Sequence, residues 1–293
     1  MEFPTFDELL DRVFYADSEV FAHDTLFVFI SHKTNERFIF HNANADDYQQ
    51  FIEKYNPILV TYNGKSYDKY ILKACLLGYG QEEIKELNDF IISGNNGWEY
   101  PFQGYCKMPP LFDLMDDIVP RKSLKEIEGG LCENITESSV PFDLPTKWTK
   151  EQYEDVLYYC TCDVEILVKL FEARKDYFMA KYTICKMGDI NPEYGMGFTN
   201  AKLTAVFLKA EKREYDDADT YEYPSNFELE KIPKEIKEYF DKFIDGKLDI
   251  HSEKLSLVID GMRGNVQEGG IHFALDNYIF ERDDFKASDY YEE

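Results

Sequence analysis

Two acids interrupt an apolar and aromatic run in the sequence Tyr15-Ala16-Asp17-Ser18-Glu19-Val20-Phe21. Such a run is typical of a β-strand, and on a strand residues two apart point to the same face. Asp17 and Glu19 are therefore expected to lie side by side, where their charges repel unless a cation sits between them. A divalent metal ion is the cation that this arrangement favours. The alternative interpretation is a strand end with solvated acids.

The composition indicates a folded and strongly acidic protein. The chain has 293 residues, of which 44% are hydrophobic, with 22 Tyr and 23 Phe, as in globular proteins. Its 57 acidic residues against 32 basic ones give a net charge of −25. This charge argues against broad electrostatic binding to nucleic acid or to an anionic membrane, because both need a basic surface. The negative net charge does not exclude a small binding site in which metal ions carry the positive charge.

The sequence carries no evident membrane or secretion signal. No apolar run approaches the length of a membrane-spanning helix, and residues 1–7 lack a basic-then-apolar pattern. We therefore expect a cytoplasmic protein that has no membrane partner and keeps its six cysteines as reduced thiols. Cys160 and Cys162 lie in a helical stretch, about 200° apart around its axis, so we do not expect them to share one ion.

Periodicity and turn residues predict an α/β fold. Three successive strands followed by alternating helices and strands favour a mixed β-sheet with helices packed on it. The strands are predicted at residues 13–19, 25–31, 37–41, 57–62 and 111–114, and the helices at residues 45–55, 66–77, 82–92, 123–128 and 149–179. Asn44 is predicted to cap the first of these helices, and Thr149 with Gln152 to form a capping box at the start of the last.

A second acidic segment follows the predicted strand at residues 57–62. The chain turns at Asn63-Gly64, and Asp68 lies in the first turn of the next helix, where it can point back towards the strand ends. An acid at this position is also stabilised by the helix dipole, which is the purely structural interpretation.

A third segment combines a phenol with a carboxylate. Tyr159 and Asp163 are four residues apart, so they share one face of the predicted helix and can reach one site together. Tyr158 lies about 100° away around the helix and is expected to pack elsewhere. The structural interpretation of the pair is an amphipathic helix with a surface tyrosine and a surface aspartate.

In chain order, these three segments resemble the exonuclease motifs of the DEDD superfamily, in the subclass with tyrosine in its third motif. Asp-x-Glu corresponds to Asp17 and Glu19, Asn-x-x-x-Tyr-Asp to Asn63, Tyr67 and Asp68, and Tyr-x-x-x-Asp to Tyr159 and Asp163. Residues 123–128 and 140–143 also look like the proofreading exonuclease of phage-type, family B-like DNA polymerases. The resemblance covers roughly residues 10–180.

The resemblance implies a ribonuclease H-like mixed sheet and a 3′→5′ exonuclease that removes nucleoside monophosphates from single-stranded DNA 3′ ends. It also implies two Mg²⁺ or Mn²⁺ ions about 4 Å apart. Asp17 would bridge the ions, Glu19 and Asp163 would hold the one that activates water, and Asp68 would support the second through a water molecule. Tyr159 would orient the attacking water with help from Glu19.

Five further residues are candidates for contact with the DNA strand. Aromatic rings can stack on terminal bases, and ammonium groups can meet phosphates. These substrate-binding candidates are Phe21, Asn63, Lys65, Tyr67 and Lys125.

The C-terminal part is expected to form a smaller α+β extension. We divide the chain into an exonuclease domain at residues 1–185 and an extension at residues 186–293, with helices at 198–212 and 233–244 and a strand and turn at 255–266. The segment Gly269-Gly270-Ile271-His272 looks like one that precedes the first polymerase carboxylate motif in phage-type enzymes. The extension is then the start of a truncated polymerase module, or the chain is a natural stand-alone relative, and in either case we expect no polymerase activity.

The resemblance also implies binding partners and a location for the protein. The chain would meet a polymerase module or other replication proteins, and it would lie in the host cytoplasm if a phage encodes it. An RNA 3′ exonuclease of the same superfamily remains an alternative, because no residue addresses the 2′-hydroxyl. A non-catalytic acidic DNA mimic is a second alternative, suggested by the charge of −25.

Overall fold

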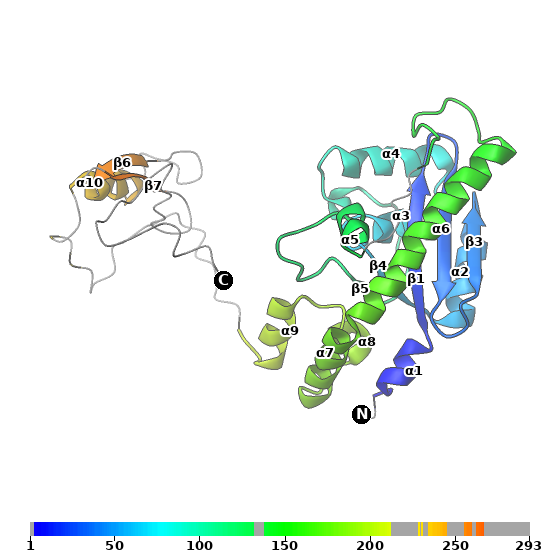
Figure 1. Ribbon diagram of the computed structural model, residues 1–293, viewed down its shortest axis with the longest axis horizontal. Helices are drawn as coiled ribbons and strands as arrows, with labels where there is room; N and C mark the ends of the chain where they lie inside the picture. Colours follow the sequence, from blue (N-terminus) through cyan, green and yellow to red (C-terminus); the bar gives the residue numbers. More distant parts are fainter. Residues whose placement is uncertain are drawn as a thin grey trace. The chain divides into compact units, whose positions relative to one another are not determined.

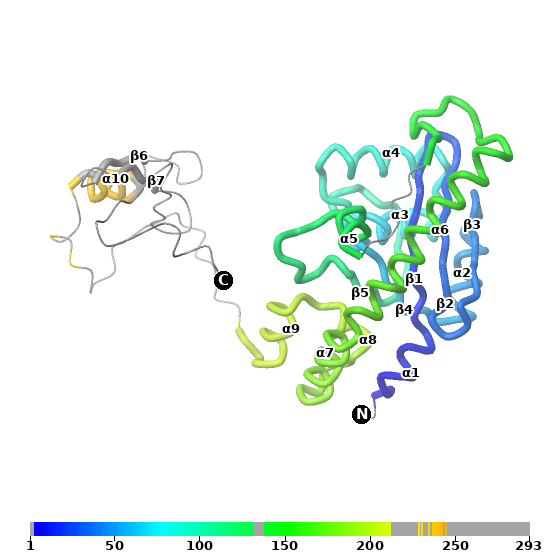
Figure 2. Tube along the Cα trace, in the orientation of Figure 1, coloured from blue at the N-terminus to red at the C-terminus, as the bar shows by residue number. Residues whose placement is uncertain are grey.

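The computed structural model describes residues 3–131, 138–211, 228, 230, 234–244, 255–259 and 262–266. Contacts divide the chain into two compact units, Met1–Glu211 and Lys212–Glu293 (Figure 2). Each unit is described by itself. The assignment of an exonuclease domain to residues 1–185 stays a prediction, and the segment Gly269-Gly270-Ile271-His272 lies outside the described residues.

The first unit is built on a five-stranded mixed sheet, which confirms the predicted α/β class. Its order is β3-β2-β1-β4-β5. β1 pairs antiparallel with β2, and β2 with β3, whereas β4 runs parallel to both β1 and β5. The strands are β1 (Val13–Val20), β2 (Thr25–Ser31), β3 (Arg37–His41), β4 (Ile58–Thr61) and β5 (Leu111–Asp113).

Helices cover both faces of this sheet. Those of the first unit are α1 (Phe6–Leu10), α2 (Ala45–Tyr55), α3 (Asp68–Leu76), α4 (Gln81–Ile92), α5 (Leu124–Gly130), α6 (Lys150–Ala173), α7 (Lys175–Met187), α8 (Pro192–Gly195) and α9 (Asn200–Phe207), with a 3₁₀ turn, η1, at Gly97–Glu99. The predicted caps are confirmed: capping boxes open α2 at Asn44 and α6 at Thr149. α1 was not predicted.

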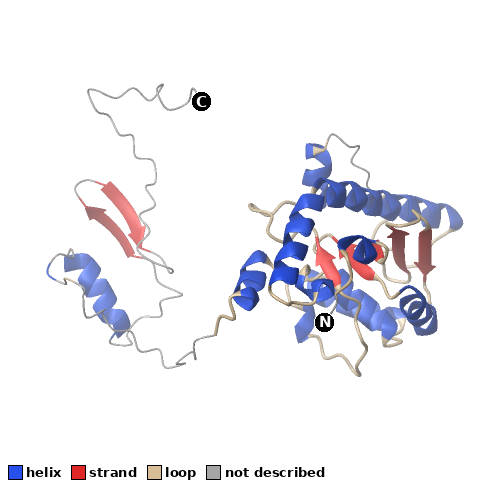
Figure 3. Cartoon of the chain, turned by 90° about the horizontal axis from the view of Figure 1, so that it is seen from below, coloured by secondary structure: helices blue, strands red, loops and turns tan. Residues whose placement is uncertain are grey.

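Figures 1 and 3 show the helices on the two faces of the sheet. A hydrophobic core lies on each face, so the sheet is between two cores. Alternation along β1 supplies both of them. Val13 and Tyr15 face α6, where the Tyr15 ring meets Phe171 edge to face with the ring centroids 5.7 Å apart. Phe14 faces the layer of α2, α3 and α4 and packs on Phe51. The odd-numbered face of β1 is therefore the face that α6 covers.

The sequence predicted one helix at residues 149–179, and this prediction is wrong. The helix ends at Ala173, and a new one, α7, begins at Lys175. The residue between them, Arg174, has φ −104° and ψ 12°, outside the helical region. Its guanidinium donates hydrogen bonds to the backbone oxygens of Leu114 and Asp116 in the loop after β5. A tertiary contact therefore interrupts a segment whose local pattern is helical throughout.

The described part of the second unit consists of one helix and one hairpin. α10 spans Lys234–Ile244, and β6 (Leu255–Ile259) pairs antiparallel with β7 (Met262–Val266). The helix and the strand-and-turn pattern are as predicted. Nowhere in the described parts of the chain is a helix both long and apolar enough to cross a membrane.

Candidate active site

β1 brings the first two acids under α6. Asp17 and Glu19 continue the face that carries Tyr15, so the strand points them towards α6, and Glu19 is only 8% exposed. Cys160 of α6 meets them there: one ligand atom from each of Asp17, Glu19 and Cys160 lies within 4.8 Å of the other two. The two acids are thus side by side, as strand alternation predicts. The interpretation of a strand end with solvated acids does not describe a buried Glu19.

Asp68 reaches the same region from the end of β4. Because β4 runs parallel to β1, with Val60 opposite Tyr15, the segment after β4 emerges beside the acidic end of β1. Asp68 is the first residue of α3 and is buried, and its Oδ1 accepts a hydrogen bond of 2.5 Å from the Ser18 hydroxyl. The third acid is therefore anchored directly to β1.

The turn between β4 and α3 has the geometry that its residues require. Asn63 has φ 60°, the left-handed conformation that asparagine tolerates better than most residues. At Gly64, an added Cβ would lie 2.2 Å from Oγ1 of Thr61, so only glycine fits against the strand. The Asn63-Gly64 turn predicted from the sequence is thus set by both residues.

A buried aspartate that the sequence analysis did not single out holds this turn. Asp113 ends β5, beside Thr61 in the parallel register. Its carboxylate accepts backbone hydrogen bonds from Asn63 at 2.8 Å, Lys65 at 3.0 Å and Met115 at 3.0 Å. Asp113 therefore positions the segment that leads to Asp68. The signal that could have found it is an acid at the end of a strand parallel to β4.

α6 places Tyr159 and Asp163 one turn apart, as their spacing predicts. Asp163 is buried, and its Oδ1 accepts a 2.5 Å hydrogen bond from Nζ of Lys125 on α5. The same Nζ lies 4.8 Å from the centroid of the Tyr159 ring. Burial, and then Glu19 and Asp163, raise the pKa of the Tyr159 hydroxyl, which stays protonated at neutral pH. The Lys125 ammonium group therefore contacts both the Asp163 carboxylate and the Tyr159 ring.

Glu128 is a further carboxylate that sequence reasoning missed. It lies one turn beyond Lys125 on α5, is 1% exposed, and accepts a 3.2 Å hydrogen bond from the Lys125 ammonium through Oε1. Its second oxygen, Oε2, is buried without a hydrogen-bond partner. Burial raises the pKa of Glu128, and the nearby charge of Asp163 adds to the rise. The ammonium group of Lys125 therefore lies between two carboxylates, those of Glu128 and Asp163.

Burial raises the pKa values of all four predicted acids, and repulsion within the group adds to the rise for Asp17 and Glu19. Burial is the largest cause for Asp17, followed by the charges of Asp68, Glu19 and Asp163, and together they hold its pKa well above the ordinary value. Burial, then Asp163 and Asp68, raise the pKa of Glu19 to about 8. Burial raises the pKa of Asp68 to about 7 and also raises that of Asp163. The four acids therefore form one electrostatically coupled group.

Two of the predicted substrate-binding residues are engaged elsewhere. Phe21 is 1% exposed and stacks on Phe142, with ring centroids 4.7 Å apart, and its contact with a base stays a prediction. Lys65 donates hydrogen bonds to the Asp116 carboxylate and to the backbone oxygen of Gly197, and its contact with phosphate stays a prediction.

Of the remaining candidates, Lys125 contacts Asp163 as described above, whereas Tyr67 and Asn63 differ in how close they lie to the acids. Tyr67 is half-buried, and the charges of Asp68, Glu19 and Asp17 add to burial in raising its pKa, so it lies near the acids. Its hydroxyl donates a 2.5 Å hydrogen bond to the Asn88 side chain. Asn63 is exposed at the turn before α3.

The donor atoms of the cluster suit a metal ion. Three or more His, Cys, Asp or Glu side chains can hold an ion when their ligand atoms lie close together. Among the described residues, one such group is found, and it consists of Asp17, Glu19 and Cys160. Carboxylate oxygens are the ligands that Mg²⁺ and Mn²⁺ prefer, and an ion would offset the burial and the repulsion by Asp163 and Asp68 that raise the pKa of Glu19. The structure therefore supports a metal site without fixing the metal or the number of ions.

Comparison with known proteins adds no assignment. No protein-family model matches the chain, and no curated protein is similar enough in sequence to count as a relative.

Proposed function

We propose that this chain is a metal-dependent 3′→5′ exonuclease of the DEDD superfamily, in its tyrosine subclass, that removes nucleoside monophosphates from single-stranded DNA 3′ ends. One observation carries the proposal. Asp17 and Glu19 on β1, Asp68 on α3, and Tyr159 and Asp163 on α6 come from segments far apart in sequence, yet each acid raises the pKa of another or of the tyrosine. The mixed sheet with its antiparallel and parallel halves is compatible with the ribonuclease H-like fold that the resemblance implies.

The cost of burying these acids favours a functional interpretation. Raising the pKa of Glu19 from 4.5 to about 8 destabilises the folded protein by about 3 kcal/mol at pH 7. Solvated structural acids carry no such cost. A cation bound among the carboxylates would offset the repulsion, because it favours their charged forms.

Three of the acids would bind the ions directly, and the fourth would contact an ion through a water molecule. Asp17, Glu19 and Asp163 would bind the ions directly, and Asp68, held by Ser18, would act through a water molecule. The bound ions would stabilise the charge that develops on the phosphate and lower the pKa of the attacking water.

The remaining side chains would position the reactants. Because its pKa is raised, the Tyr159 hydroxyl keeps its proton and can donate a hydrogen bond that orients the water. Lys125, beside both Asp163 and the Tyr159 ring, places a positive charge where a phosphate would approach. The site would thus attract a single strand end, although the net charge of −25 disfavours extended binding along DNA.

The test is degradation of a 5′-labelled single-stranded DNA oligonucleotide with Mg²⁺ or Mn²⁺. We expect a ladder that shortens from the 3′ end and that disappears with EDTA and in Asp163→Asn. Glu154→Gln is the matched control, because Glu154 is an exposed acid on the same helix. An RNA oligonucleotide of the same sequence separates the DNA enzyme from an RNA 3′ exonuclease. Degradation that persists in Asp163→Asn, or none with either metal, would contradict the proposal, and tight binding to a basic protein without cleavage would favour the DNA mimic.

A further inference from the structure

A thiol lies among the proposed metal ligands. Cys160 follows Tyr159 on α6 and is 0% exposed. Its Sγ lies 3.7 Å from Oδ2 of Asp17 and 3.8 Å from the backbone oxygen of the same residue, so the thiol points at the acid on β1. The exonuclease chemistry proposed above makes no use of this sulfur.

The spacing of the three ligand atoms suits a small tetrahedral ion. With a metal–sulfur distance of about 2.3 Å and metal–oxygen distances of about 2.1 Å, two ligands of a tetrahedral site are about 3.6 Å apart. The distance between Cys160 Sγ and Asp17 Oδ2 is 3.7 Å, and the ligand atom of Glu19 lies within 4.8 Å of both. A modest approach of Glu19 would therefore complete three ligands, and a water molecule can supply the fourth.

The burial of Glu19 is a second observation, independent of the position of the thiol. Glu19 is 8% exposed, and within the described part of the chain its carboxylate forms no hydrogen bond or salt bridge, although the charge of Lys125 reaches it and lowers its pKa. A buried carboxylate normally has such a partner. The side chain is directed at Asp17 and Cys160, so the partner it lacks would sit among these three residues.

The donor set determines which ions this position prefers. Mg²⁺ takes oxygen ligands almost exclusively, whereas a thiolate selects softer or borderline ions such as Zn²⁺ and Cd²⁺. We propose that Asp17, Glu19 and Cys160 bind one Zn²⁺ or Cd²⁺ ion, and that this ion inhibits the enzyme by occupying the position of a catalytic Mg²⁺. On binding, the S–H bond of Cys160 breaks, its proton passes to water, and a sulfur–metal bond forms. The inhibition rests on the proposed nuclease function, but the binding does not.

Cys162 provides a matched control on the same helix. It lies two residues beyond Cys160, about 200° around the helix, and is only half-buried. It does not belong to the ligand group formed by Asp17 and Glu19. The two serine variants therefore remove a similar thiol from α6, inside and outside the site.

The first experiment follows Cd²⁺ binding to the full chain through the ultraviolet charge-transfer band of a thiolate–metal bond. We expect the unaltered protein and Cys162→Ser to show the same saturable band. Cys160→Ser should bind Cd²⁺ at least about tenfold more weakly, because even the loss of an indirect partner of a metal ligand costs 10- to 100-fold. The absence of a band in the unaltered protein, or an unchanged band in Cys160→Ser, would overturn the proposal.

X-ray absorption on the Zn²⁺-loaded, unaltered chain decides the matter without a variant. We expect one sulfur atom at about 2.3 Å from the zinc, together with oxygen atoms. A shell of oxygen and nitrogen alone would contradict the assignment even if Cys160→Ser failed to fold.

The inhibition is then measured as the Zn²⁺ concentration that halves cleavage, relative to each variant's own rate with Mg²⁺. We expect this concentration to rise at least about tenfold in Cys160→Ser and to stay unchanged in Cys162→Ser. If thiolate binding is present but no variant cleaves DNA under any metal, the soft-metal site stands and the nuclease proposal fails. If cleavage is normal and Zn²⁺ inhibits Cys160→Ser equally, the role of the thiol fails and the nuclease proposal stands.

Discussion

At the scale of single residues, removing the hydroxyl of Tyr159 tests the positioning of the attacking water without removing a metal ligand. The hydroxyl lies near Glu19, Asp163 and Asp17, whose charges raise its pKa, but in the proposed mechanism Tyr159 binds no ion. We expect Tyr159→Phe to slow cleavage by up to about 100-fold, because a misplaced water reacts slowly, while the Mn²⁺-induced thermal shift stays unchanged. Single-turnover cleavage and thermal unfolding measure the two effects. Tyr158→Phe, which alters an exposed ring next in the chain, is the control, and equal rates in the two variants would remove Tyr159 from the site.

Asp113 should affect stability and activity together. Three backbone N–H groups donate to its carboxylate, and an asparagine would turn an NH₂ group towards one of them. We expect Asp113→Asn to lower the free energy of unfolding by about 2–3 kcal/mol and to reduce cleavage strongly, because the turn that leads to Asp68 loses its anchor. Denaturant unfolding and the oligonucleotide assay provide the measurements.

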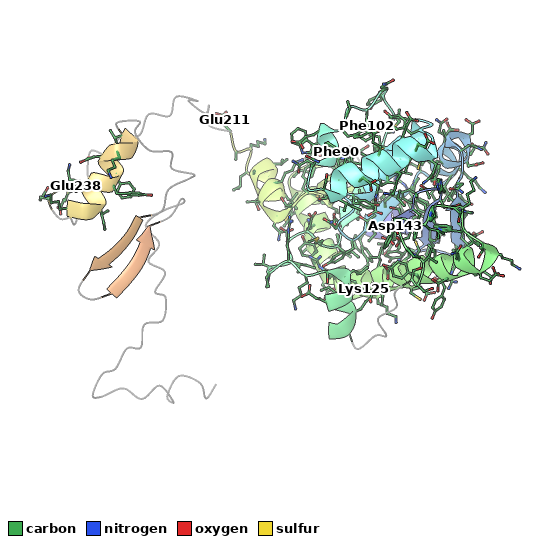
Figure 4. All side chains as sticks on the ribbon, turned by 90° about the horizontal axis from the view of Figure 1, so that it is seen from above. Phe90, Phe102, Lys125, Asp143, Glu211 and Glu238 are labelled. Atoms are coloured by element: carbon green, nitrogen blue, oxygen red, sulfur yellow. The ribbon has the colours of Figure 1, made fainter. Side chains whose placement is uncertain are left out.

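The control for Asp113→Asn is Asp143→Asn, which changes an exposed acid in the loop before α6 (Figure 4). We expect the free energy of unfolding of Asp143→Asn to differ from that of the unaltered protein by less than about 0.5 kcal/mol. An Asp113→Asn protein as stable and active as this control would show that the turn does not depend on the carboxylate.

The residues that could be predicted are those placed by local periodicity. The two-residue period of a strand aligned Asp17 with Glu19, and the helical period aligned Tyr159 with Asp163. Asp113, Glu128 and Cys160 could not be found in this way, because their importance comes from burial and from partners distant in sequence. The same limit applies to the burial of Phe21, whose ring is covered by a residue 121 positions later in the chain.

At the scale of elements, the break between α6 and α7 depends on one side chain. Arg174 donates to two backbone oxygens after β5, and its guanidinium carbon lies 4.3 Å from the centroid of the Tyr177 ring. We expect Arg174→Ala to lower the free energy of unfolding by about 1.5–3 kcal/mol, the range for hydrogen bonds to a charged group. The measurement is denaturant unfolding. Lys175→Ala removes only a surface ion pair with Glu172 and should cost less than about 1 kcal/mol. Equal costs would mean that the break has another cause.

Strands and capped helices were predictable because their signals are short-range. The limits predicted for β2, β3 and α2 agree with the structure, since alternation, the turn at residues 33–36 and the Asn44 cap are all local. The end of α6 was not predictable, because residues 170–178 contain neither glycine nor proline and the contact that ends the helix comes from the loop after β5. α1, only five residues long, has too little periodicity to be recognised.

At the scale of the whole molecule, the net charge of −25 and the buried acids pose one physical problem. A compact chain with this charge repels itself, and the site concentrates the repulsion where water cannot screen it. A divalent ion relieves the repulsion locally. Metal binding should therefore be visible in the stability of the entire first unit and not only in catalysis.

The stability of the metal-free protein should accordingly fall as the pH rises from 6 to 8. Glu19 and Asp68 have pKa values of about 8 and about 7 in the folded state, against 4.5 and 3.8 ordinarily, so in this range the folded state binds more protons than the unfolded state. The free energy of unfolding then decreases with pH, by about 4 kcal/mol over these two units. His32 works in the opposite direction, because burial lowers its pKa, but it is a single and only partly buried group.

Mg²⁺ or Mn²⁺ should reverse this fall, because the ions bind the charged carboxylates of the native state alone and so stabilise it more at pH 8 than at pH 6. Denaturant unfolding at both pH values, in EDTA and in millimolar metal, measures the four free energies. In Glu19→Gln one titrating ligand is absent, so both the pH slope in EDTA and the gain from metal should shrink. A free energy of unfolding in EDTA that stays constant or rises from pH 6 to pH 8 would mean that the acids are not held in the buried, repelling arrangement from which the metal site is inferred.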